Sequence, residues 1–264
     1  LFVGEEYIVF PAGNSVVVHN INSRQQRIFL PPEKFSSGIS AIAIAESKPN
    51  VAFGDNFEGP SICIFDIHTM HPRNFLHLGV DFGSVGFISL SFSGDGKYLL
   101  AHGGKPGWAL VVWDWESSQT VGSVKTAEDV TPVTQCSFSP GKNPQIAVTG
   151  NNILKVYKVE NNKLSEVIIP DSKIGNIVCH LWLNETVLLC ANSSGDVISV
   201  TTTPQASVLD EKKDFEHRDS AIVAMARHRK GFLTASEGGY LTIYDATAKP
   251  NVFAAVRTIQ LFTE

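Results

Sequence analysis

Short hydrophobic runs, separated by Gly, Asp and Pro, recur along this chain of 264 residues. The clearest set lies between Phe87 and Asp114, where FISLSFS, KYLLA and ALVVWD follow one another with turn residues between them. Apolar or alternating runs of this length, bounded by such residues, are typical of antiparallel strands joined by tight turns. The pattern therefore predicts an all-β chain.

The same order of runs returns at a regular interval. The triplet Ser91-Phe92-Ser93 returns as Ser137-Phe138-Ser139, 46 positions later. A large residue recurs near the end of the third run, with spacings of 48, 44, 43 and 44 residues. This column consists of Phe65, Trp113, Tyr157, Val200 and Tyr244. A period of about 44 residues with four strands per unit is typical of a blade of a WD-repeat β-propeller.

The runs divide the chain into six units of one incomplete propeller, residues 1–264. We expect a partial first blade at 1–32, followed by five full blades at 38–79, 85–126, 132–170, 176–211 and 219–264. No run in residues 1–6 has the pattern of an innermost strand. An unclosed ring leaves open edges and uncovered sheet faces, which soluble proteins avoid. We therefore interpret the chain as a fragment of a seven-bladed ring.

Charge, cysteine content and the length of the apolar runs argue against nucleic acid as a partner, against an oxidising compartment and against a membrane segment. The formal net charge is −5 and the Lys and Arg residues are scattered, so the chain has no basic face for nucleic acid. Its four cysteines are widely spaced without a C-x-x-C pair, which favours a reducing compartment such as the cytoplasm. No apolar run reaches about 18 residues and no signal-peptide pattern is visible, so we expect no membrane segment.

The stretch VVWDWES, which ends at Ser117, could mark a site or a repeat. We interpret Trp113-Asp114 as the end of a third strand, where the ring packs between blades and the aspartate begins a turn. The pairs Phe65-Asp66 and Tyr244-Asp245 repeat the arrangement. Trp115 lies on the opposite face from Trp113 or just beyond the strand, and its exposure stays open.

Candidate chemistry is sparse. His68 and His71 lie in a turn without a nearby carboxylate or thiol, and His180 with its neighbouring cysteines fits core packing better than a metal site. The glycine-rich run 103–107 lacks the Gly-Lys-Ser/Thr ending of a phosphate loop. We therefore expect no enzyme, no metal or other cofactor and no small-molecule substrate. A propeller hydrolase would need acidic or histidine side chains converging on the central channel, where the inner strands offer few.

One basic cluster suits binding. Arg227, Arg229 and Lys230 surround a predicted turn between two strands of the sixth blade. Such a cluster is either a solvated hairpin tip or a contact for an acidic surface such as a tubulin tail. The mixed-charge connection Glu211–Asp219 is interpreted as exposed.

The stretches FPAGNSVVVHNI, VVWDWES and VTGNNILKVYK, at these mutual spacings, resemble the WD-repeat cilia- and flagella-associated proteins. The resemblance spans Tyr7 to Ile259. The chain departs from common WD repeats because no Gly-His pair precedes its blades, so the Asp-His-Ser-Trp hydrogen-bond network of those repeats is not expected.

The resemblance implies a non-enzymatic, microtubule-associated scaffold of the ciliary or flagellar axoneme. It also implies that the chain helps to place or regulate inner-arm dyneins. The implied partners are inner-arm dynein components, tubulin or neighbouring ciliary WD-repeat proteins. The competing hypothesis is a general cytoplasmic WD-repeat adaptor, such as a ubiquitin-ligase receptor or a trafficking scaffold.

Overall fold

The computed structural model describes residues 1–32, 35, 37–57, 59–126, 132–160, 163–169, 175–202, 207–209, 220–248 and 252–261. The connection Glu211–Asp219 lies outside them. In the described part of the chain, no helix is long and apolar enough to cross a membrane.

The described residues form six antiparallel sheets of four strands, and we call these sheets blades one to six in chain order. In each blade the strands pair in the order in which they occur along the chain. Blades one to three contain β1 (Phe2–Val3), β2 (Tyr7–Ala12), β3 (Ser15–Asn20), β4 (Gln26–Phe29); β5 (Ile39–Ile44), β6 (Asn50–Asp55), β7 (Ser61–Asp66), β8 (His71–His77); and β9 (Phe87–Phe92), β10 (Tyr98–Gly103), β11 (Ala109–Asp114), β12 (Gln119–Lys125).

Blades four to six repeat this plan. They contain β13 (Val133–Phe138), β14 (Gln145–Gly150), β15 (Ile153–Glu160), β16 (Lys163–Val167); β17 (Ile177–Trp182), β18 (Val187–Asn192), β19 (Val197–Thr201), β20 (Ser207–Leu209); and β21 (Ile222–His228), β22 (Gly231–Ser236), β23 (Tyr240–Ala246), β24 (Phe253–Gln260). A short 3-10 helix, η2 (Val80–Phe82), lies between blades two and three.

The prediction of a propeller with four-stranded antiparallel blades is confirmed, but the prediction of five blades plus a partial one is wrong. Blade one also has four strands, because Phe2 and Val3 pair with Ile8 and Tyr7. A strand of two residues is too short to show an alternating pattern, so hydrophobic periodicity could not predict it.

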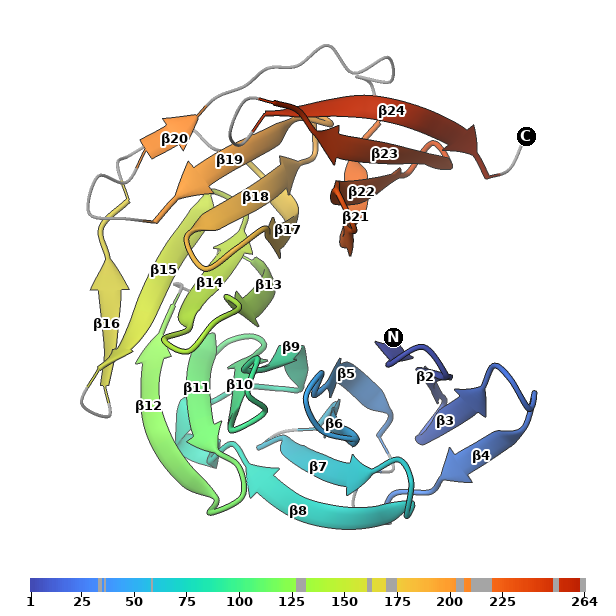
Figure 1. Ribbon diagram of the computed structural model, residues 1–264. Helices are drawn as coiled ribbons and strands as arrows, with labels where there is room; N and C mark the ends of the chain where they lie inside the picture. Colours follow the sequence, from blue (N-terminus) through green and yellow to red (C-terminus); the bar gives the residue numbers. More distant parts are fainter. Residues whose placement is uncertain are drawn as a thin grey trace.

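The blades follow one another around an arc, with blade one and blade six at its two ends (Figure 1). Neighbouring inner strands contact each other, as β5 contacts β9 and β17 contacts β21. The second strands of blades two to five are buried on both faces; all six residues of β6 and of β14 are buried. The outer strands alternate between exposed and covered positions, since only one of their faces packs on the core.

Candidate functional site

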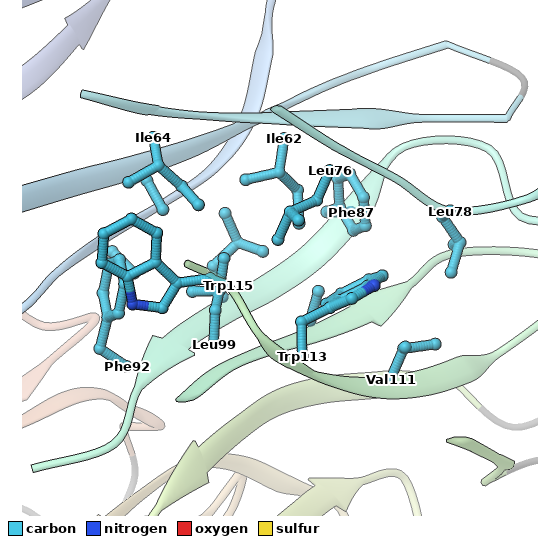
Figure 2. Packing of buried hydrophobic residues seen from close by; sticks show 14 of the residues in the cluster. Ile62, Ile64, Leu76, Leu78, Phe87, Phe92, Leu99, Val111, Trp113 and Trp115 are labelled. Carbon is cyan, nitrogen blue, oxygen red and sulfur yellow. The ribbon is translucent and has the colours of Figure 1, made fainter. Parts of the chain in front are cut away.

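The large residues of the repeating column lie on the third strand of their blades. Their exposed fractions are 0% for Phe65, 4% for Trp113, 2% for Tyr157, 0% for Val200 and 4% for Tyr244. Each packs toward the preceding blade. Trp113, for example, shares one hydrophobic cluster with Ile62 and Ile64 of blade two (Figure 2). Burial on this scale stabilises the stack of blades and leaves no ring surface for a ligand.

Asp66 and Asp114 end their third strands and begin the turns to the outer strands, whereas Asp245 lies within β23 and pairs with Ala254 of β24. Oδ1 of Asp66 accepts hydrogen bonds from the backbone N–H groups of His68 and Thr69, at 2.8 and 3.0 Å. Partial burial raises the pKa of Asp66, but these two bonds and nearby positive charges outweigh it and lower the pKa below its usual value. Asp114 accepts a longer bond, 3.4 Å, from the backbone of Ser117. These carboxylates cap turns.

Trp115 is buried, with an exposed fraction of 2%. Its indole Nε1–H donates to the carbonyl oxygen of Gly96 at 2.8 Å, and its ring meets the ring of Phe92 edge-on (Figure 2). Lys48 of blade two lies over the indole at 5.6 Å from its centroid and pairs with Glu116 at 2.8 Å. Trp115 and Glu116 therefore join blade three to blade two through their contacts with Lys48.

His180 is enclosed between blades four and five. Its ring nitrogens lie 2.7 Å from the hydroxyl oxygens of Ser137 and Thr149, and its backbone N–H donates to the amide oxygen of Gln135 at 2.8 Å. Complete burial lowers the pKa of His180 to about 3, because the charged form would lose its hydration. The imidazole is neutral at physiological pH and bridges two blades.

The cysteines beside His180 point to opposite sides of blade five. Cys190 packs in the cluster shared with blade four, and Cys179 in the cluster shared with blade six. Burial raises the pKa of the Cys179 thiol to about 11 and that of Cys190 further still. Both thiols are therefore protonated and poor metal ligands or nucleophiles.

The remaining candidates lie in or next to turns. His68 is exposed in the turn after β7 and His71 is exposed at the start of β8. The described residues contain no group of three or more His, Cys, Asp or Glu that could hold a metal ion. The glycine-rich run 103–107 joins β10 to β11. A side chain at Gly107 would collide with the carbonyl oxygen of Phe82, so the close approach of these two loops explains the glycine.

The structure places the basic cluster at the end of β21 and in the turn to β22. Arg227, His228, Arg229 and Lys230 are all exposed. The Nε–H of Arg227 donates to the carbonyl oxygen of Trp182 in blade five, at 2.9 Å. Arg227 also lines a cavity of about 470 Å³ at the inner ends of the blades. We call Arg227, Arg229 and Lys230 the basic tip.

Comparison with known proteins supplies the biological context. No family model matches the chain. Cilia- and flagella-associated protein 57 of Mus musculus is 29% identical over 196 residues, which cover 74% of this chain and 16% of that protein. Cilia- and flagella-associated protein 57 C of Tetrahymena thermophila is 29% identical over 177 residues, 62% of this chain and 13% of that protein. The chain resembles the ciliary WD-repeat proteins.

This resemblance covers a small part of each relative, since the chain spans less than a fifth of either protein's length. Echinoderm microtubule-associated protein-like 4 of Xenopus laevis is 22% identical over 88% of this chain and 27% of its own length. The two cilia- and flagella-associated relatives confirm the resemblance that the sequence motifs indicated.

Solved structures share the fold. The WD40 repeats of RRP9 match 97% of this chain and 78% of that chain with a TM-score of 0.75 at 15% identity. A chain of the mitotic checkpoint complex matches 96% of this chain and 74% of its own length with a TM-score of 0.75 at 12% identity. At these identities the matches describe the WD-repeat propeller architecture alone.

Proposed function

We propose that this chain is a non-enzymatic WD-repeat scaffold of the motile-cilium axoneme. The observation that carries the proposal is the similarity to cilia- and flagella-associated protein 57 from a mammal and a ciliate, over most of this chain. A stack of six blades that exposes turns at both ends of each blade offers extended surface for protein contacts. Location in the cilium or flagellum follows from the same relatives.

The interior supports the non-enzymatic part of the proposal. The ring nitrogens of His180 both lie against hydroxyl groups, and burial keeps the imidazole neutral. Burial lowers the pKa of His102 to about 4, and its Nε2 lies 2.6 Å from the hydroxyl oxygen of Thr126. A general base needs access to substrate and a pKa near the working pH. Neither histidine meets these conditions.

The proposed partners are proteins of the axoneme: inner-arm dynein components, tubulin or neighbouring ciliary WD-repeat proteins. The name of the Xenopus laevis relative, microtubule-associated, supports a role near microtubules. We propose that the chain docks on one of these partners and helps to place inner-arm dyneins. The basic tip is the part of the surface that we assign to protein binding.

Localisation tests this function. The full-length protein that carries this chain is tagged in a ciliated cell, and cilia are extracted first with detergent and then with high salt. We expect the tagged protein to stay in the detergent-insoluble axoneme. A diffuse cytoplasmic signal without ciliary enrichment would contradict the proposal and favour a general WD-repeat adaptor.

We also propose that a seventh blade closes the arc. Leu233 and Ile243, on the face of blade six that points away from blade five, are half-buried. The register makes them equivalent to Leu100 and Val112 of blade three, which the following blade covers completely. An apolar sheet face of this kind is normally covered by another layer.

A further inference from the structure

Arg227 occupies a repeat position that is hydrophobic in four other blades. It pairs with Phe232, which pairs with the column residue Tyr244. In blades two to five, the column residue also pairs with a residue of the second strand, which in turn pairs with a residue of the first strand. The first-strand residues found in this way are Ile44, Phe92, Phe138 and Trp182. Packing between blades therefore selects an apolar side chain here, and an arginine needs another explanation.

The surroundings of Arg227 hold its side chain without neutralising it. The bond from Nε to the carbonyl oxygen of Trp182, 2.9 Å long, fixes the guanidinium against blade five. No carboxylate among the described residues forms an ion pair with Arg227. The two terminal nitrogens of a guanidinium held in this way can bind both oxygens of one carboxylate.

The cavity beside Arg227 has a mixed lining. Its walls include apolar residues of several inner strands, such as Ile44 and Phe92, together with Ser93 and Ser139. Glu46 of blade two is the acidic side chain in the lining. Arg229 and Lys230 follow Arg227 along the chain, in the exposed turn between β21 and β22. The charge is therefore positive at one wall of the cavity, next to apolar surface.

We infer that the basic tip and this cavity form a docking site for an acidic segment of a partner protein. A carboxylate of the segment binds the Arg227 guanidinium at the cavity wall, while Arg229 and Lys230 attract the acidic residues that follow. An apolar residue of the segment enters the cavity beside Phe92. The inference rests on the proposed scaffold function and names the chemistry of its partner.

The test is a binding measurement on the purified full-length protein. Fluorescence anisotropy compares a labelled peptide of Glu and Leu residues with the same peptide in which Gln replaces Glu. We expect the Glu peptide to bind about tenfold more tightly, and its affinity to fall as salt rises. Arg227→Leu restores the hydrophobic repeat position, so this variant folds, and we expect it to lose the tenfold preference. Arg227→Lys keeps the charge but cannot bind both oxygens of a carboxylate, so its preference for the Glu peptide should lie between those of wild type and Arg227→Leu.

Lys105→Gln serves as the matched control. Lys105 is an exposed lysine in the turn between β10 and β11, at the opposite end of a blade. Equal binding of the two peptides, no effect of Arg227→Leu, or an equal loss in Lys105→Gln would overturn the inference. Each variant is also localised in cilia. A wild-type protein that stays axonemal but ignores the Glu peptide contradicts the docking site alone, whereas absence from the axoneme contradicts the proposed function.

Discussion

His180 shows how a single buried side chain makes the whole propeller sensitive to acid. In the unfolded chain a histidine takes up a proton near pH 6.5, but burial lowers the pKa of folded His180 to about 3. Between these values the unfolded chain binds a proton that the folded chain does not. The contribution of His180 to the free energy of unfolding is therefore fully present above about pH 6.5 and is lost as the pH falls toward 3.

We predict a loss of about 1.4 kcal/mol in the free energy of unfolding for each pH unit below 6.5 and for each such histidine. His180→Gln should be less stable than wild type at pH 7.5 but lose stability less steeply on acidification. Urea unfolding followed by tryptophan fluorescence measures both. His71→Gln, a change at an exposed residue at the start of β8, is the control and should follow the wild-type curve. Parallel curves for wild type and His180→Gln would contradict the prediction.

At the scale of elements, hydrogen bonds from single side chains fasten one blade to the next. The guanidinium of Arg27, on β4, donates to the carbonyl oxygens of Ile67 and His68 at the start of the turn after β7. Asn74, on β8, donates in the same way to the carbonyl oxygen of Trp115, in the turn after β11 of blade three. Each contact joins the outer part of one blade to a turn of its neighbour.

We predict that Arg27→Met loosens blade one. The variant keeps the aliphatic part of the side chain and loses both hydrogen bonds, at a cost of about 1 kcal/mol each. Hydrogen–deuterium exchange should become faster in β2 and β3 and stay unchanged in blades three to six. Arg24→Met is the matched control, because Arg24 is exposed in the turn before β4. Faster exchange spread evenly over all blades would contradict a local effect of the Arg27 hydrogen bonds on blade one.

The sequence predicted the blades well because each blade is a local repeat. The alternating runs and the column from Phe65 to Tyr244 depend on neighbours within about 50 residues. The contacts between blades were not predictable in this way. Lys48 and Glu116 are 68 residues apart, which is longer than one repeat. The buried indole N–H of Trp115 donates to the backbone carbonyl oxygen of Gly96, and a carbonyl group carries no sequence signal. The unusual position of Arg227 was predictable, because an alignment of the inner strands places it where the other blades have a hydrophobic residue.

At the scale of the whole molecule, the two ends of the arc differ from its middle. Blade six turns Leu233 and Ile243 toward the open side, whereas their counterparts in blades two to four are buried by the next blade. Blade one likewise exposes Phe10 and Ile28, at 38% and 59%. Figure 1 shows these two blades on either side of the gap. A seventh blade would cover both faces at once.

Replacing Ile243 with Lys tests this closure in the full-length protein. If a seventh blade packs on blade six, the ammonium group is buried without a partner, and the variant should lose more than about 2 kcal/mol of unfolding free energy. Ile64→Lys, at a position that is 0% exposed, shows the cost at a covered face. Val256→Lys, at a position that is 56% exposed on β24, shows the cost at an uncovered one, about 0.5 kcal/mol or less. Chemical denaturation measures all three, and an Ile243→Lys cost equal to that of Val256→Lys would mean that the arc stays open.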